Sequence, residues 1–195
     1  MAITRLGGAN AITGTIPQGN IANASLGAVT ALPAGVGGKV LQVVQATKTD
    51  TFTTTATSFT LVTDLAASIT PSATSSKIFV TVSIMGQRSN DNGEVGQITI
   101  FKDSSNLINA SSPGSRTPSI SSGVQMGNSN GDVNAEPYSF SILNSPSTTS
   151  SITYDVRVKM ISGSGEFYIN RVEDDLNNNI RGRGISTITL MEIAG

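Results

Sequence analysis

The stretch that decides the fold is SITYDVRVKM, residues 151–160, in which apolar and polar side chains alternate. Every second residue is apolar: Ile152, Tyr154, Val156, Val158 and Met160. The residues between them are polar or charged: Thr153, Asp155, Arg157 and Lys159. Because successive side chains of a strand point to opposite faces, this pattern predicts a strand with one face in a core and the other in water. Such strands are typical of antiparallel sheets.

Similar alternation, or a short apolar run, recurs along the chain after residue 38. Further strands are expected at 40–45, 58–62, 65–70, 77–85, 95–101, 137–143, 165–170 and 185–193. Turn-forming clusters such as Asn130-Gly131 separate them, and no stretch shows a helical period. The first and last of these strands are both strongly apolar and are expected to pair at the centre of a sheet. The fold class is therefore all-β, an antiparallel β-sandwich of jelly-roll-like type.

An extended N-terminal arm is expected to precede this sandwich. The segment LGGANAITGTIPQGNIANASLGAVTALPAGVGG, residues 6–38, has no charged residue and is too rich in Gly, Pro and Asn for a stable helix. Its apolar residues are irregularly spaced and are candidate anchors to a partner: Ile12, Ile16, Ile21, Leu26, Val29 and Leu32. A flexible linker is the alternative. We divide the chain into an anchoring arm, residues 1–38, and a β-sandwich body, residues 39–195.

The composition excludes several classes of protein. The chain has 195 residues, a net charge of -1, and no Cys or His. Disulfides and thiol chemistry are therefore absent, and the charge favours neither nucleic acid nor an anionic membrane as a partner. Only 13% of the residues are charged, which fits a protein whose surface is largely covered by other subunits. The N-terminal MAITRLGG lacks the apolar block of a secretory signal, so we expect synthesis in a cytoplasm and release by lysis.

Catalysis has little support in the sequence. Without His or Cys the commonest general base and the thiol nucleophile are missing, and only clustered carboxylates remain. Asp91, Glu94, Asp174 and Asp175 lie in Asn-rich loops, where acidic residues are usually solvated. These loops offer oxygen ligands that suit Ca²⁺, but neither has the spacing of a calcium loop. We expect no enzyme activity, no cofactor and no metal site, although calcium binding by one of these loops stays open.

Charged residues gather between the last two expected strands. The sequence RVEDDLNNNIRGRG, residues 171–184, contains three arginines and three acidic residues: Arg171, Glu173, Asp174, Asp175, Arg181 and Arg183. One Arg-Gly-Arg-Gly copy without interleaved aromatic residues is weak support for nucleic-acid binding. Planar guanidinium groups suit paired carboxylates. We expect these residues to form ion pairs, either in the same chain or between neighbouring subunits.

Four stretches of the sequence resemble a known kind of protein. They are GTIPQGNIANASLGAVTALPAG, GGKVLQVVQATKTDTF, AASITPSATSSKIFV and GISTITLMEIAG. Together they resemble small virion structural proteins of tailed phages of aquatic bacteria, of the capsid decoration (cement), head-fibre or tail-fibre type. The resemblance implies a compact β-sandwich, a homotrimer and no catalysis, and it carries over no active-site residue.

The expected function is that of a homotrimeric capsid decoration protein whose arm anchors it to the shell. Its partners would be copies of itself and the major capsid protein or another virion protein. The alternative is a tail or head fibre with a receptor-binding β-sandwich tip, for which a host surface glycan would be a further partner. A depolymerase enzyme is a third possible function. The short body and the small number of candidate catalytic residues disfavour it. The expected location is the virion, after assembly in the host bacterial cytoplasm.

Overall fold

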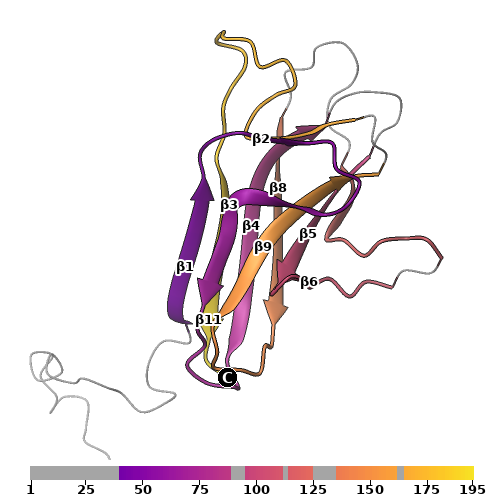
Figure 1. Cartoon of the computed structure of the whole chain (residues 1–195). Helices are drawn as coiled ribbons and strands as arrows, with labels where there is room; N and C mark the ends of the chain where they lie inside the picture. Colours follow the sequence, from indigo (N-terminus) through magenta and orange to yellow (C-terminus); the bar gives the residue numbers. More distant parts are fainter. Residues whose placement is uncertain (1–39, 89–94, 112–113, 125–134, 162–164) are drawn as a thin grey trace, which may run out of the picture. The chain divides into compact units, whose positions relative to one another are not determined.

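The computed structural model describes residues 40–88, 95–111, 114–124, 135–161 and 165–195 (Figure 1). The expected arm at 1–38 lies outside the described residues, as do its six candidate anchors. Its extended form and its boundary with the body therefore stay predictions. Asp91 and Glu94 lie outside them too.

The described part of the chain is all β, and its strand pairs are antiparallel. It contains no helix that could cross a membrane. Its strands are β1 (Val40–Lys48), β2 (Phe52–Thr54), β3 (Thr60–Ile69), β4 (Lys77–Arg88), β5 (Gly96–Lys102), β6 (Ser105–Asn106), β7 (Ser121–Val124), β8 (Glu136–Asn144), β9 (Ile152–Met160), β10 (Phe167–Ile169) and β11 (Ser186–Ile193).

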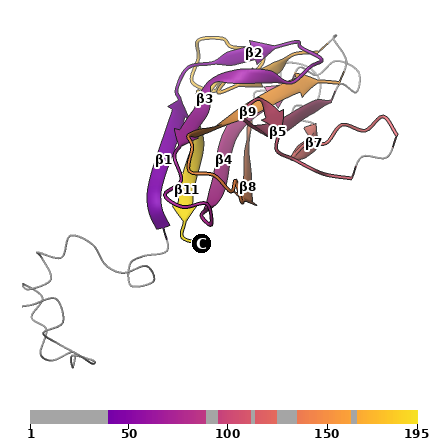
Figure 2. The same ribbon diagram turned by 60° about the horizontal axis from the view of Figure 1, so that its bottom comes forward.

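Two sheets form the sandwich, and their layers can be followed in Figures 1 and 2. In the first sheet the order is β1-β11-β4-β8, and β10 and β2 extend one end beside β4. In the second sheet the order is β3-β9-β5, with β6 and β7 on the far side of β5. With β2, β6 and β10 set aside, each sheet has four strands, and neighbours in a sheet are seldom neighbours in sequence. This arrangement is a jelly roll and confirms the expected fold class.

The core lies between the sheets and consists of the alternate residues that the sequence pattern selects. The five apolar residues of 151–160 are all buried, which confirms that stretch as a half-buried strand. Facing them from β4 are Ile78, Val80, Val82 and Ile84, all fully buried. Burying one such side chain contributes about 1.5–3 kcal/mol relative to leaving it in water. The Tyr154 hydroxyl donates a hydrogen bond to Asn144 Oδ1 (2.8 Å), so its polar end is satisfied as well.

A buried carboxylate fastens the end of the first sheet at which β1 begins. Glu192 of β11 is fully buried and accepts hydrogen bonds from the Ser72 amide (2.7 Å), the Ser72 and Ser76 hydroxyls (2.6 and 2.7 Å) and Gln42 Nε2 (2.6 Å). Burial alone would raise its pKa, but these donors lower the pKa of Glu192 to about 2. One ionised side chain therefore joins β1, β11 and the turn between β3 and β4.

The strand predictions need three corrections. The strands expected at 58–62 and 65–70 are one strand, β3, with an irregular register between Leu61 and Ala66. Asp64 there has a φ of 65°, and this bulge lets both Val62 and Leu65 face the core. β1 and β11 do pair, but β1 lies at the edge of its sheet and only β11 is central. The short strands β2, β6 and β7 were not expected from the sequence.

Candidate functional site

The candidate site is the loop of residues 171–185, which joins β10 to β11. It extends from the end of the sandwich opposite the C-terminus and is drawn in yellow in Figure 1. Its two ends are fastened together, since the Gly184 amide donates to the Asn170 carbonyl (3.3 Å) and the Ser186 hydroxyl donates to Asn170 Oδ1 (2.6 Å). A loop whose ends meet in this way is compact rather than a loose connection.

Asn170 is the anchor of this loop. It is fully buried and has a φ of 60°, a left-handed conformation that Asn tolerates better than most residues. Its Nδ2 donates to the carbonyl oxygens of Lys48 (3.0 Å) and Asp50 (2.9 Å). Its backbone amide donates to the carbonyl oxygen of Met85 (2.9 Å). The loop is therefore rooted in the end of β1, in β4 and in β11 at once.

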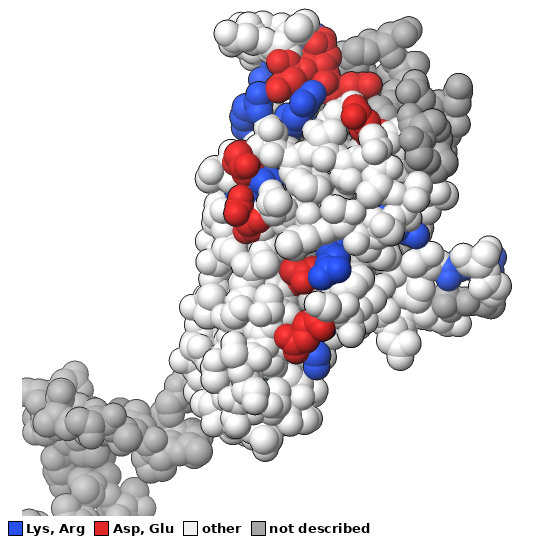
Figure 3. Space-filling model, in the orientation of Figure 1, with Lys and Arg blue, Asp and Glu red and all other residues white. Residues whose placement is uncertain are grey.

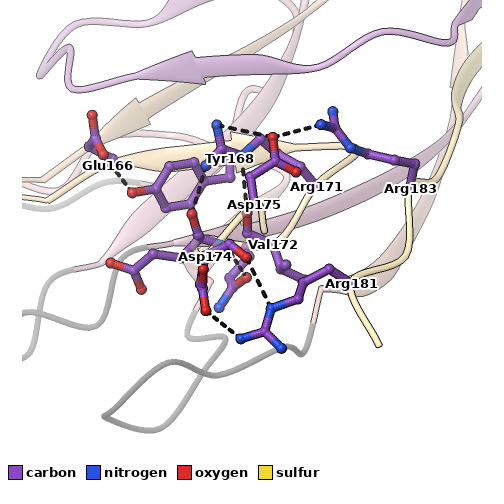
Figure 4. Close-up of polar contacts among 10 residues, drawn as sticks. Glu166, Tyr168, Arg171, Val172, Asp174, Asp175, Arg181 and Arg183 are labelled. Atoms are coloured by element: carbon purple, nitrogen blue, oxygen red, sulfur yellow. Dashed lines mark hydrogen bonds and ion pairs between the residues drawn. The ribbon is translucent and has the colours of Figure 1, made fainter. Parts of the chain in front are cut away.

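Ion pairs cross-link the loop, as Figure 4 shows. Arg181 pairs with Asp174, and Arg183 lies 2.6 Å from an Asp175 carboxylate oxygen. Arg171 lies 3.9 Å from the same Asp175 oxygen. The carboxylates of Asp174 and Asp175 are thus held among three guanidinium groups of their own chain.

Arg171 also fixes the start of the loop. Its guanidinium donates to the carbonyl oxygens of Val172 (3.0 Å) and Glu173 (2.6 Å) and lies 4.8 Å from the centroid of the Tyr168 ring. Burial, followed by the hydrogen bond to Glu166, raises the pKa of Tyr168, so the phenol stays protonated. The Glu173 amide donates to Gln87 Oε1 (2.8 Å), which ties the loop to β4.

The six charged residues singled out in the sequence therefore come together in one loop. Within a single chain, ion pairs join Arg171, Asp174, Asp175, Arg181 and Arg183, and Glu173 contributes its backbone to the same network. Contacts of these residues with a neighbouring subunit stay a prediction.

The carboxylates of Asp174 and Asp175 are already engaged by guanidinium groups. A cation at Asp174 or Asp175 would compete with the guanidinium groups already there. In the described ranges, no group of three or more Asp, Glu, His or Cys residues is arranged to hold a metal ion. Asp91 and Glu94 lie outside those ranges, so calcium binding by their loop stays open.

Besides Ile185, which is 60% exposed at its end, this loop exposes two apolar side chains. Leu176 is 58% exposed and Ile180 is 60% exposed. Leu176, Asp175 and Arg181 are among the residues that line a small open pocket of about 220 Å³. We did not predict either apolar residue as part of a site. The available signal was their isolation in DLNNNIRG, where a leucine and an isoleucine stand among Asn, Asp and Arg.

Comparison with known proteins gives no family. No family model matches the chain, and no curated protein matches it. Among solved structures, it is similar to a protein of T=1 particles derived from infectious bursal virus, with 12% identity and a TM-score of 0.41 over 78% of this chain. It is also similar to VP2 of the infectious bursal disease virus subviral particle, with 13% identity and a TM-score of 0.38 over 78% of this chain.

The chain spans 36% and 37% of the lengths of those two proteins. Likenesses this distant carry no argument about function. The fold assignment rests on the strand order and registers given above, and a jelly roll serves lectins and cupins as well as capsid proteins.

Proposed function

We propose that the protein is a non-enzymatic structural protein of a tailed-phage virion, a homotrimeric decoration protein whose residues 1–38 anchor it to the capsid. In this proposal it is made in the bacterial cytoplasm and becomes part of the particle there. Its partners are other copies of itself and the major capsid protein or another virion protein.

The observation that carries the proposal is that the start of β1 and the charged loop lie at opposite ends of the body. β1 begins at Val40, at the end fastened by Glu192, whereas the loop of residues 171–185 leads into the start of β11, at the opposite end of that strand. At about 3.4 Å per residue, the two ends of β1 lie about 25–30 Å apart. An arm continuing from Val40 would hold the body by one rigid end and leave the loop at the other.

Two further observations favour a structural role. The loop's charged side chains are engaged with one another, and the whole chain lacks the His and Cys on which most acid–base and thiol catalysis depends. The arm residues 6–38 carry apolar anchors and no charge, and at about 25 cal/mol per Å² of apolar area such anchors gain by docking in a groove. The four sequence stretches that resemble phage virion proteins point to the same role.

The test is binding of the purified full-length protein to phage particles stripped of it. Replacing Ile12, Ile16, Ile21 and Leu26 together with Ser should abolish binding and leave the circular dichroism spectrum and melting temperature unchanged. The matched control replaces three polar arm residues, Thr13, Gln18 and Asn20, with Ala and should bind like the wild type. Full occupancy by the anchor variant would refute the anchoring role, and absence of the protein from purified particles would refute the virion assignment.

A fibre protein with a receptor-binding tip is the second candidate, and the rigid loop at the far end of the body favours it. Leu176 and Ile180 project there from a cross-linked base, as contact residues of a tip would. Quantitative mass spectrometry of purified particles separates the two functions. A decoration protein should approach the copy number of the major capsid protein, and a fibre should fall far below it.

A further inference from the structure

The outer face of the first sheet carries a row of apolar side chains from one edge to the other. In the register of the sheet, Val43 of β1 lies opposite Met191 of β11, Met191 opposite Phe79 of β4, and Phe79 opposite Leu143 of β8. All four belong to the alternation that points away from the core, because their strand neighbours Val44, Leu190, Val80 and Ile142 pack inside. The edge residues Val43 and Leu143 are 57% and 52% exposed.

In the described part of the chain, the surroundings of this row carry a single charge, Lys77, which lies two residues before Phe79 on β4. The next row toward the loop end consists of Gln45, Thr189, Thr81 and Ser141, and the one after it of Thr47, Thr187, Ser83 and Ser139. Among the described residues that face outward from β1, β11, β4 and β8, Lys77 is the one charged residue, and it stands at the start of β4. A partner covering the face would therefore find apolar groups, hydroxyls and one amide, with the single charge of Lys77 at the end away from the loop.

The β1 edge beside this row also lacks a cover within the described chain. β1 pairs with β11 on one side, and no described strand pairs with its other side. Val40 and Leu41, at the start of the strand, are 48% and 49% exposed. A nine-residue edge strand with exposed apolar side chains is a site for unwanted pairing unless another subunit covers it.

We infer that this outer face is the surface through which copies of the chain pack against one another. A face whose one charge stands at its end selects a partner with little charge of its own, since burying an unpaired charge against it is costly. The apolar row of a second copy is such a surface. In a closed symmetric assembly every subunit can have both its apolar row and its β1 edge covered by a neighbour. The inference rests on the proposed function in one respect, because it names the contact by which the homo-oligomer of that proposal forms.

The test is sedimentation velocity of the full-length chain over a wide concentration range. The wild type should sediment as an oligomer of the 20.0 kDa chain. The double variant Val43→Lys, Leu143→Lys places two charges on the row at its exposed edges and should weaken self-association at least about 100-fold. The control Leu61→Lys, Ile161→Lys alters residues 39% and 52% exposed elsewhere on the body and should assemble like the wild type. A monomeric wild type, or a double variant that assembles normally, overturns the inference.

A second measurement serves if the lysine variant fails to fold. Because the chain has no Cys, one introduced thiol reports on one position. Ser141→Cys on this face should be shielded from a maleimide reagent in the oligomer, whereas Ala66→Cys on the outer face of the other sheet should react freely; both positions are exposed in the single chain. Equal reactivity of the two overturns the inference, and so does shielding of position 141 in a protein that sediments as a monomer.

These outcomes are separable from those of the proposed function. If the protein is absent from particles but assembles through this face, only the virion assignment fails. If it coats particles while the double variant still assembles normally, only the surface named here is wrong.

Discussion

The two sheets have equivalent inner faces and different outer faces. On the second sheet, β9 points Asp155, Arg157 and Lys159 outward; Asp155 is buried and paired with Arg157, and the two cations cover aromatic residues. Arg157 lies 4.0 Å from the centroid of the Phe101 ring, and Lys159 lies 5.0 Å from that of Phe59. On the first sheet, no such cation–π contact covers Phe79 among the described residues.

This difference separates two kinds of surface that share one strand pattern. Alternation decides which residues face the core, and the chemistry of the outward residues decides whether water or another subunit covers them. Figure 3 shows charged side chains in small mixed clusters over one face of the body, densest at the end that carries the loop. We therefore expect the second sheet and the loop to face solvent, and the first sheet to face another copy.

The largest effect should come from the inner face, which both sheets share. Leu190→Ala removes a fully buried side chain and should lower the free energy of unfolding by about 2–5 kcal/mol. The neighbouring Met191→Ala, on the outer face of the same strand, should cost under about 1 kcal/mol in the dissociated chain. Urea denaturation of both variants at low protein concentration makes the comparison. Equal losses would contradict the assignment of inner and outer faces.

Asn170→Ala should come next. It leaves the carbonyl oxygens of Lys48 and Asp50 without their donor and places Ala at a positive φ, so we expect a loss of about 2–4 kcal/mol. Hydrogen exchange should show the loss first at residues 171–186. Asn178→Ala, a change to an exposed Asn within the loop, is the control and should cost well under about 1 kcal/mol.

Glu192 should make the stability of the first sheet depend on pH. Its pKa is lowered from 4.5 to about 2 in the folded chain, so its contribution is complete above about pH 4.5 and is lost as the pH falls toward 2. Glu192→Gln should cost about 1–3 kcal/mol at pH 7 and much less at pH 2.5, because the wild-type carboxyl is by then losing its charge. Unfolding curves at the two pH values measure this, and a loss that does not shrink on acidification would contradict it.

The smallest of these stability effects should come from the charged outer face of the second sheet. Lys159→Met removes the cover of Phe59 and the hydrogen bond to the Thr117 hydroxyl, at a cost of about 1 kcal/mol. The sharper readout is association, because the variant makes this face resemble the first one. Sedimentation should detect new self-association that the wild type lacks, and Arg183→Met, whose side chain is 55% exposed in the loop, should not produce it.

Local sequence pattern was enough to predict most of the fold. Alternation located β4, β8, β9 and β11, because each of these strands needs one apolar face for the core. It did not reveal β2 or β7, which have little apolar content and are held by pairing with β10 and β5. It split β3 in two, because the bulge at Asp64 shifts the alternation by one residue, and a single sequence gives no separate signal for such a shift.

The sequence indicated which charged residues lie in the loop, but not how the loop is attached to the sandwich. Clustered charges between two strands predicted ion pairs, and Arg–Asp pairs form within the loop. The role of Asn170 depends on Lys48 and Asp50, which are 122 and 120 residues away in the chain, so no local pattern could indicate it. The apolar row is likewise a product of register, since Val43, Met191, Phe79 and Leu143 come from four strands and meet only when those strands align.

The fastening at Asn170 and Ser186 has a consequence for how the chain can diversify. With both ends of residues 171–185 secured to the sandwich, an altered tip transmits little strain to the strands below it. A library of insertions should therefore be tolerated between Leu176 and Ile180 more readily than at the turn held by Glu192.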